Sequence, residues 1–543
     1  MAVLQVLSAL ALLWISLGFL RRRLYPTVLE NVPGPPGESW IAGSLNYVRN
    51  HKGWDYHQNL ADTFGKVVRL KGAWQSDRLL VFDQKAMYHV LVKDYNIYEE
   101  TDSFIEGNKI MFGHGIFTSL GDEHRRHRRM LNPVFSSAHM RQMVPIFYEV
   151  AHKVKDVFLN KVQNGPQEVD VVNWMTRLAL ELIGQSGLGY SFDELTETSP
   201  QHKYGLMSKK LVTMQGDEFV RDWVMPRLTR IGTPAFRKFL VDLMPFEAIA
   251  GMKEIVNVLH DTSTLIFETK KKALAEGDEA VQNQVGRGKD IISILMKRNV
   301  LASDEDKLSD EEVLAQITSL TFAATDTTSG ALSRILHQLA IHKDAQDRVR
   351  EEIREARREN GGQDIGYDEL ATLPYLDAVC RETLRLYPPI SWVPREANED
   401  VILPLSKPIR GLNGEEIREI PVPKGTNVSV SLLAANRDPD LWGPDALEWK
   451  PERWLNPLPE ALVEAHVPGI YSHLMTFLGG GRSCLGFKFS QLEMKVVLTL
   501  LLENLEFSLS KQPIIWQMFA ISTPNVDPDS VIPTMPMIIS MAK

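Results

Sequence analysis

The sequence predicts a mainly α-helical fold with a minor β-sheet, arranged around one long central helix. Three observations support this prediction: an unusually long helical run at 308–340, a charged helical pattern directly after it at 343–360, and short β-branched runs separated by Gly and Pro turns further on. Hydrophobic residues make up 44% of the 543 and charged residues 24%, a composition that suits a globular protein with a large core.

The long helical run opens with a clear N-terminal cap. Ser309 followed by Glu312 forms a capping-box pattern, and acidic residues favour the positive end of a helix. Apolar and small residues then continue for about 45 Å at roughly 1.5 Å per residue. Between residues 322 and 330 only Asp326 is charged. The pattern predicts a helix that crosses the interior and is buried on most sides.

The elements after the central helix complete the predicted fold. An ion-paired, solvated helix is expected at 343–360, and another at 375–389 that stops at its prolines. The β-branched runs at 401–405, 419–422 and 427–433 predict one small sheet. No clear linker interrupts this body, so we expect one large domain.

Charge and cysteine content narrow the class of protein. The formal net charge is −9, so no nucleic acid is expected as a partner. The two cysteines, Cys380 and Cys484, cannot build a disulfide framework. This is typical of a reducing compartment and leaves each thiol free for another role.

The N-terminal segment predicts membrane attachment. The first twenty residues carry no charge and lead into three arginines, and twenty helical residues span about 30 Å, the thickness of a bilayer's hydrocarbon core. Positive charge after the apolar run predicts a transmembrane anchor at 1–23, with the rest of the chain facing the cytoplasm. A removed signal peptide and a buried core helix are the alternatives. A Pro/Gly-rich hinge is expected at 24–37 and a single globular domain at 38–543.

The glycine-rich segment FLGGGRSCLGFK, residues 477–488, first suggests a phosphate-binding loop. A P-loop requires lysine and then a hydroxyl residue after its second glycine, and this chain has Phe487 and Lys488 at those positions. The groups that would hold phosphate and magnesium are therefore missing.

Cys484 suits the presentation of a thiolate better. It stands directly before an apolar helical run at 485–507, and a thiolate is stabilised by about 0.3–1 kcal/mol at the start of a helix. The surrounding glycines allow close approach to a flat group, and Arg482 supplies a cation for a carboxylate of that group. Such a loop could seat a haem. A buried, inert cysteine is the alternative.

The ten residues 477–486 match the pattern F-x-x-G-x-R-x-C-x-G. On this match the chain resembles the cytochrome P450 family of haem-thiolate monooxygenases, in its membrane-anchored eukaryotic form with a haem-enclosing fold. The resemblance implies a haem b cofactor whose iron has the Cys484 sulfur as its axial ligand. It also implies that the pattern's fixed positions bind the cofactor, namely Phe477, Gly480, Arg482, Cys484 and Gly486.

Two further motifs resemble the structural core of the family. E-T-L-R places Glu382 and Arg385 three residues apart on one helix face, a spacing that is also common in exposed pairs worth about 0–1 kcal/mol. P-E-R-W resembles the family's Pro-x-Arg-Phe and has Trp454 where Phe is usual. The resemblance implies that Arg453 joins the pair in a buried network whose loss impairs folding or haem retention.

The segment A-A-T-D-T-T at 323–328 resembles the oxygen-side motif of the family. The resemblance implies that Thr327 faces the oxygen-binding side of the haem and that Asp326 assists proton delivery. Ala324 stands where glycine is commoner, which could narrow the groove above the haem. The alternative is an interior helix whose threonines only bond to their own backbone.

Three residues resemble the family's partners for the haem propionates. Arg128 matches a propionate-contacting arginine, and His124 takes the place of a tryptophan that often precedes it by four residues. Arg395 matches another such arginine. Propionates in a partly dry crevice need these partners because unpaired buried charge is costly.

The resemblance also implies an activity and its partners. It implies a monooxygenase at the endoplasmic reticulum membrane that inserts one atom of O2 into a hydrophobic small molecule, such as a terpenoid, fatty acid or aromatic, using electrons from an NADPH-dependent flavoprotein reductase. The basic residues Arg125, Arg126 and Arg129 could form a docking patch for that reductase. A haem-thiolate isomerase or dehydratase that needs no O2, and a non-catalytic haem sensor, are the rival functions.

The pocket-lining segments of relatives correspond here to 101–117, the central helix, 388–393 and 514–523. They are rich in apolar and aromatic side chains, which favours a hydrophobic substrate, and no charged anchor for it is evident. Cys380 lies on the helix of the E-T-L-R motif and is expected to be structural.

Overall fold

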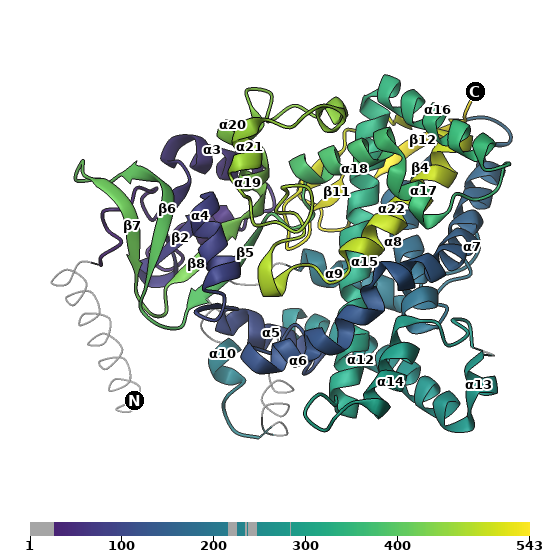
Figure 1. The fold of residues 1–543 in the computed structure, drawn as a ribbon, viewed down its shortest axis with the longest axis horizontal. Coiled ribbons are helices and arrows are strands. Elements are labelled where there is room, and N and C mark those ends of the chain that lie inside the picture. Colours follow the sequence, from purple (N-terminus) through teal and green to yellow (C-terminus); the bar gives the residue numbers. More distant parts are fainter. Residues whose placement is uncertain (1–26, 215–224, 234–235, 237–246, 283) are drawn as a thin grey trace.

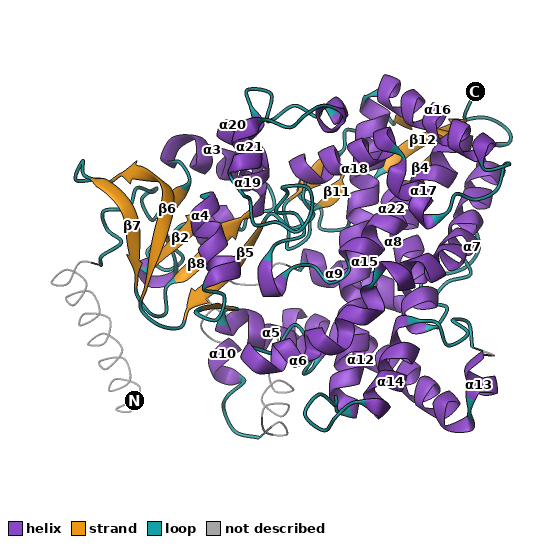
Figure 2. Cartoon of the chain, in the orientation of Figure 1, coloured by secondary structure: helices purple, strands orange, loops and turns teal. Residues whose placement is uncertain are grey.

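The computed structural model describes residues 27–214, 225–233, 236, 247–282 and 284–543. Helices make up just over half of the molecule and small sheets a minor part, so the predicted fold class is confirmed (Figures 1 and 2). The helices are α2 (Leu45–Val48), α3 (Trp54–Phe64), α4 (Gln84–Tyr88), α5 (Asp102–Phe112), α6 (Gly121–Leu131), α7 (Ser137–Val162), α8 (Val171–Leu182), α9 (Lys203–Thr213), α10 (Met225–Leu228), α12 (Glu247–Glu276), α13 (Asp278–Gln282), α14 (Ile291–Leu301), α15 (Asp310–Ile341), α16 (Lys343–Glu359), α17 (Tyr367–Thr372), α18 (Pro374–Leu386), α19 (Leu432–Arg437), α20 (Pro439–Trp442), α21 (Glu460–Glu464) and α22 (Phe487–Asn504).

The strands gather mainly at the end of the molecule opposite the long helices (Figure 2). The largest sheet has the order β1-β2-β8-β5-β3, β6 pairs with β7, β10 pairs with β11, and β12 lies between β4 and β9. The strands are β1 (Val67–Lys71), β2 (Asp77–Val81), β3 (Tyr98–Glu99), β4 (Gln167–Asp170), β5 (Trp392–Ala397), β6 (Val401–Arg410), β7 (Glu416–Val422), β8 (Asn427–Ser431), β9 (Leu505–Leu509), β10 (Ile515–Gln517), β11 (Thr523–Asn525) and β12 (Pro536–Met541).

The prediction of one small sheet from three successive runs was wrong for the last run. β6 and β7 form an antiparallel hairpin, but β8 lies between β2 and β5 in the larger sheet. Val428 and Val430 are fully buried there, opposite Leu79 and Val81 of β2. β8 follows β7 in the sequence yet buries its apolar side chains against a strand from the N-terminal part, and no local pattern signals that choice.

The predicted central helix is α15, which runs through the middle of the molecule (Figure 1). The Ser309 hydroxyl accepts a hydrogen bond from the Glu312 N–H, and the Glu312 carboxylate accepts one from the Ser309 N–H, so the capping box is confirmed. α15 packs against α8, α18 and α22, which explains why most of its residues are buried.

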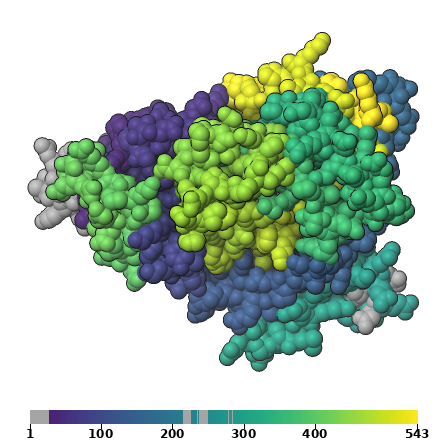
Figure 3. Space-filling view, turned by 45° about the horizontal axis from the view of Figure 1, so that its top comes forward, coloured from purple at the N-terminus to yellow at the C-terminus, as the bar shows by residue number. Residues whose placement is uncertain are grey.

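The chain from α19 to α22, coloured yellow-green, covers the middle of the face shown in Figure 3. It lies between N-terminal segments in purple and green-teal helices that precede it in the sequence. This stretch includes two short 3-10 helices that matter for the site, η6 (Pro451–Leu455) and η7 (Gly480–Arg482). The same stretch of chain therefore carries both the P-E-R-W motif and the cysteine loop.

The localisation prediction requires a correction. Among the described residues, no helix is both long and apolar enough to cross a membrane. The longest ones, α12 and α15, carry several charged side chains along their length. Single-pass anchoring in the endoplasmic reticulum membrane is therefore not supported. The predicted anchor at 1–23 lies outside the described residues.

Candidate active site

The cysteine loop is held by its own backbone and by neighbouring segments. The Cys484 N–H donates to the Phe477 carbonyl at 2.8 Å, which closes the loop. The Phe477 ring is buried and meets the Tyr471 ring edge to face, with centroids 5.6 Å apart. Gly486 is the N-cap of α22, so the cysteine does stand just before the start of that helix as predicted.

Two loop glycines are required by protein packing. At Gly480, where φ is +69°, a Cβ would lie 1.9 Å from the Leu91 carbonyl oxygen. At Gly479 it would lie 1.8 Å from the Pro468 carbonyl oxygen. A Cβ at Gly486 would meet nothing closer than 4.0 Å. The sequence suggested that the loop glycines let the backbone approach a flat group. At 479 and 480 the group that lies close is instead the protein's own backbone.

Cys484 is exposed, although protein atoms surround its sulfur closely. Burial raises the pKa of its thiol to about 11, while the Gly486 N–H and the Arg128 guanidinium act in the opposite direction. The helix start alone therefore does not make this sulfur a thiolate at neutral pH. A further cation is needed to hold it deprotonated.

Basic side chains from three separate segments converge beside the cysteine loop. Arg128 of α6 donates to the Ser483 carbonyl at 2.7 Å and to the Ser483 hydroxyl at 3.4 Å. Arg482 donates to the Ser119 carbonyl at 2.8 Å. Arg395 of β5 lies 3.0 Å from one carboxylate oxygen of Glu100. The other oxygen of the same carboxylate is 4.0 Å from Arg482. The predicted propionate partners are thus brought together.

His124 lies among these arginines. It is buried, and burial together with the positive charges of Arg482 and Arg128 lowers its pKa to about 3. Its imidazole is therefore neutral at physiological pH. A neutral ring can donate one hydrogen bond, as the indole of the usual tryptophan does.

The other arginines of this helix are already paired. Arg125 bonds to Asp122, Arg126 to Glu312, and Arg129 to Asp306 at 2.6 Å. A patch whose charges are each balanced by a carboxylate of the same chain offers little net attraction to an acidic partner. The predicted docking patch therefore gains no support from the geometry.

The E-T-L-R and P-E-R-W motifs meet in a buried network. Arg385 donates to both Glu382 oxygens at 2.8 and 2.9 Å, and both side chains have 0% exposure. Arg453 reaches Glu382 at 3.5 Å. The Trp454 indole N–H donates to Glu382 at 3.0 Å. The unusual tryptophan therefore adds a hydrogen bond that phenylalanine could not make.

The middle of α15 has one accessible stripe. Leu320, Ala323, Ala324 and Thr327 are partly exposed, whereas most of their neighbours on the helix are buried. Their spacing places them on one face of the helix. The Thr327 hydroxyl donates to the Ala323 carbonyl at 2.7 Å. Thr327 is thus the polar group on the open face, and at rest it bonds to its own helix.

Asp326 points elsewhere. Its carboxylate is 2.7 Å from the Lys209 Nζ of α9 and also accepts a hydrogen bond from the Ser208 hydroxyl. The carboxylate is fully buried, and the lysine is 14% exposed. One residue along a helix turns the side chain by about 100°, which separates Asp326 from the face that carries Thr327. In this arrangement Asp326 links α15 to α9.

Replacing Lys209 with methionine should leave this carboxylate buried with one partner fewer. We expect the free energy of unfolding to fall by about 1–3 kcal/mol, measured by urea denaturation. Lys210→Met is the matched control, because Lys210 pairs with Glu254 on the surface and its loss should cost no more than about 0.5 kcal/mol. Equal effects of the two substitutions would contradict a buried ion pair.

Cys380 behaves as expected for a structural residue. It is 3% exposed in the main hydrophobic core, and burial raises the pKa of its thiol to about 12.

Comparison with known proteins decides the family. The sequence model described as "Cytochrome P450" matches residues 33–526. The chain belongs to the cytochrome P450 family. It is 49% identical to Cytochrome P450 monooxygenase 91 of Postia placenta over 100% of this chain and 99% of that protein. It is 44% identical to the ganoderic acid synthetase of Ganoderma lucidum, over 95% and 94%, and 36% identical to the cytochrome P450 monooxygenase eriI of Hericium erinaceus, over 99% and 98%.

Membership of the cytochrome P450 family implies an enzyme, an oxidoreductase, with a haem-iron cofactor. The residues present fit that group. Cys484 is accessible and needs a cation to become a thiolate, which an iron ion supplies. Among the described residues Arg128 bonds only to neutral groups, and Arg395 and Arg482 share a single carboxylate. Three arginines against the carboxylates of Glu99 and Glu100 leave positive charge beside the cysteine, which suits a haem propionate.

Sequence reasoning missed two charged residues near the P450 site and the hydrogen bond that Trp454 makes. Glu100 bridges Arg395 and Arg482, Lys209 holds Asp326, and Trp454 bonds to Glu382. Lys209 and Glu100 each stand beside an identical charged residue, Lys210 and Glu99, in ordinary helical and loop patterns, so nothing local distinguishes them. Trp454 carried a signal, because it departs from the family's usual phenylalanine.

Proposed function

We propose that this protein is a haem b monooxygenase that inserts one atom of O2 into a hydrophobic small molecule, with electrons from NADPH through a separate flavoprotein reductase. The observation that carries the proposal is the accessible Cys484 with Arg128, Arg395 and Arg482 converging beside it. The name of the ganoderic acid synthetase supports a biosynthetic role, and terpenoids, fatty acids and aromatics remain the candidate substrates. We assign this activity to one catalytic domain over residues 38–543.

Residues of the cysteine loop and of the neighbouring α6 and β5 would hold the cofactor. Cys484 would ligate the haem iron through its sulfur, and Arg128, Arg395 and Arg482 together with His124 would hold the propionates. Phe477 and Gly480 act indirectly, because they set the shape of the loop that presents the sulfur, and Gly486 contributes its backbone N–H, which acts on the Cys484 sulfur. Glu382, Arg385 and Arg453 fix the segments that carry it.

A cysteine-ligated haem supplies dioxygen activation, which the electron-rich sulfur promotes. The chain's own contribution to the chemistry is the control of protons. The Thr327 hydroxyl can turn from the Ala323 carbonyl to the open face and hold a water or a proton there. For Asp326 to take part, its carboxylate must first leave Lys209. Proton delivery through Asp326 therefore requires a local rearrangement at α9.

The test is reconstitution of the haem-loaded protein with an NADPH-dependent flavoprotein reductase and a panel of hydrophobic compounds under labelled dioxygen. We expect substrate-dependent NADPH consumption and one labelled oxygen atom in the product. A product formed without NADPH and O2 would show an isomerase or dehydratase. Haem binding with no response to any compound in spin state or NADPH consumption would favour a sensor.

Thr327→Ala should uncouple the reaction. The variant should still bind haem and consume NADPH, but a several-fold smaller share of that NADPH should appear as product, because the polar group on the open face is gone. Thr325→Ala is the matched control. Its hydroxyl makes the same bond, 2.7 Å to the Thr321 carbonyl, but the side chain is fully buried. Equal coupling in the two variants would remove Thr327 from the mechanism.

A further inference from the structure

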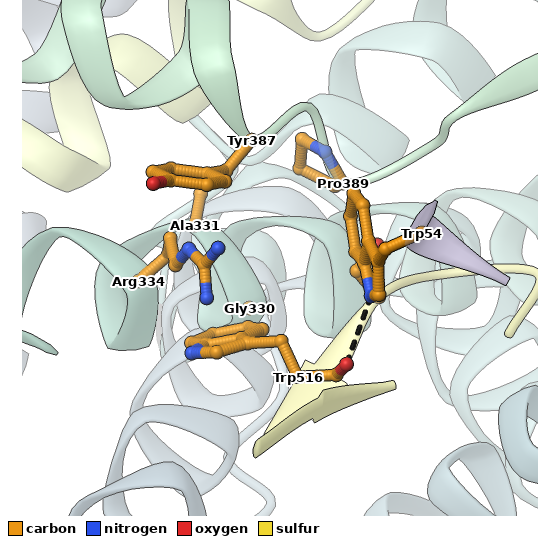
Figure 4. A pocket seen from close by; sticks show the side chains of 8 residues that line it. Trp54, Gly330, Ala331, Arg334, Tyr387, Pro389 and Trp516 are labelled. Atoms are coloured by element: carbon orange, nitrogen blue, oxygen red, sulfur yellow. Dashed lines mark hydrogen bonds between the residues drawn. The ribbon is translucent and has the colours of Figure 1, made fainter. Parts of the chain in front are cut away.

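An arginine on the central helix lies in the interior without a counter-charge. Arg334 is 9% exposed, and its guanidinium is stacked between two aromatic rings, 3.6 Å from the Tyr387 ring centre and 4.4 Å from that of Trp516. Figure 4 shows the guanidinium between the two rings, with its nitrogen atoms turned toward the side where Trp54 and Pro389 lie. Both faces of the cation are covered, so only its edge is available to a ligand.

Nothing in the described part of the chain neutralises this charge. Arg334 forms no salt bridge there, and its Nε has no hydrogen-bond partner. The charged side chain that acts on it is another cation, Arg437, which donates to the Leu386 carbonyl. Burial and the neighbouring cation lower the pKa of Arg334 to about 9, although the Tyr387 phenol acts in the opposite direction. A buried, unpaired cation is costly and favours an anion beside it.

The edge of Arg334 faces a small enclosed cavity. Its volume is about 10 Å³, close to the space that one water-sized group needs. Ser522 lines it, and the Ser522 hydroxyl also has no hydrogen-bond partner among the described residues. The other lining groups are aromatic rings, a proline and backbone, with no carboxylate among them. The cavity therefore offers a charged N–H donor and a hydroxyl. No carboxylate lines it that would compete with a bound anion for the guanidinium.

We infer that Arg334 and Ser522 bind a small monovalent anionic group, a carboxylate or a halide, in the plane of the guanidinium. The aromatic rings on both faces exclude a larger ligand and fix the direction of approach. The cavity admits a single compact group, so any longer molecule must keep its apolar body outside.

The position of the cavity suggests where such a molecule would lie. Arg334 is seven residues after Thr327, which places both on the same side of α15, about 10 Å apart along the axis. Pro389, Trp516 and Ser522 come from the segments 388–393 and 514–523 that were expected to line the substrate pocket. The anionic group therefore has two possible sources, the carboxylate end of an apolar ligand or a free ion. In the first case Arg334 would be a charged anchor for the ligand, which the sequence alone did not reveal.

The first experiment tests the free ion. Thermal unfolding of the full-length, haem-loaded protein is followed while chloride replaces methanesulfonate, a larger anion, at constant ionic strength. We expect chloride to raise the unfolding temperature of the wild type by at least a degree and to leave Arg334→Gln unchanged, because binding to the folded state alone stabilises it. Ser522→Ala, which removes one hydroxyl only, should weaken the chloride effect while preserving the fold.

The second experiment tests the carboxylate. Equilibrium dialysis of labelled dodecanoate and dodecanol, in chloride-free buffer, compares wild type with Arg334→Gln. We expect dodecanoate to bind the wild type about tenfold or more tightly than the variant, and dodecanol to bind both alike. Both experiments measure binding rather than turnover, so their outcome does not depend on the monooxygenase activity.

Arg348→Gln is the matched control in both experiments. Its guanidinium also stacks on a tyrosine, 3.9 Å from the Tyr375 ring centre, but it is half exposed and paired with Glu452. If Arg334→Gln removes only the stabilisation by chloride, the bound group is a free ion. If it weakens dodecanoate binding, the bound group is a ligand carboxylate. If neither anion distinguishes the wild type from Arg334→Gln, or if Arg348→Gln gives the same change, the site does not exist.

Discussion

Cys484→Ala is expected to abolish the thiolate spectrum and the oxygenase activity together. In the reduced, carbon-monoxide-treated protein, the wild type should give a strongly red-shifted Soret band, because an anionic sulfur donates electron density to the iron. The variant should lose that band even where some haem stays bound through the three arginines. Absorption spectroscopy of the purified proteins provides the measurement.

The second cysteine supplies the control for this experiment. Cys380→Ala removes a thiol that is buried in the core and has a strongly raised pKa, so it should retain the red-shifted band. It should lose only the stability of a small core cavity, about 1 kcal/mol. A band typical of histidine ligation in the wild type, or an unchanged band in Cys484→Ala, would refute the assignment of the axial ligand.

Glu382→Gln should destabilise the whole protein. Glu382 is fully buried and receives hydrogen bonds from Arg385 and Trp454, with Arg453 at 3.5 Å. Without its charge the two arginines keep theirs in the interior, and breaking a buried pair in this way costs about 3–5 kcal/mol. We expect a fall of this size in the free energy of unfolding, together with loss of haem during purification.

An exposed pair shows whether the effect comes from burial. Glu416→Gln removes the same charge from a surface pair with Arg418, in which both side chains are about two-thirds or more exposed, and should change stability by no more than about 0.5 kcal/mol. Trp454→Phe should lie between the two, because it removes one hydrogen bond to the buried carboxylate. If Glu382→Gln and Glu416→Gln behave alike, the network does not stabilise the fold.

Patterns that depend on neighbours in the sequence were the ones that predicted the fold well. The capping box at Ser309 located the start of α15, and the charged pattern after it matches α16 (Lys343–Glu359). β8 was assigned to the wrong sheet because its buried valines pack against β2, far away in the sequence. Helix caps and amphipathic periods are local, whereas the choice of a strand partner is not.

The candidate site shows the same difference between residues that local motifs identify and contacts that depend on distant segments. The motif residues around Cys484 and Glu382 could be named from the sequence, and the structure brings their partners together. The direction of Asp326 could not be predicted, because it depends on Lys209 in another helix. The free charge of Arg334 was equally hidden, since an arginine without a partner leaves no mark on the sequence around it.

The two crowded glycines of the cysteine loop have a consequence for biogenesis. Because Gly479 and Gly480 lie against the carbonyls of Pro468 and Leu91, the curvature of the loop is set by the polypeptide itself. A newly made chain can therefore shape this loop before it meets its prosthetic group, so cofactor capture can follow folding instead of directing it. Over evolutionary time these two positions should resist replacement even in relatives that have changed their substrates, whereas Gly486, with open space around it, is free of that particular restriction.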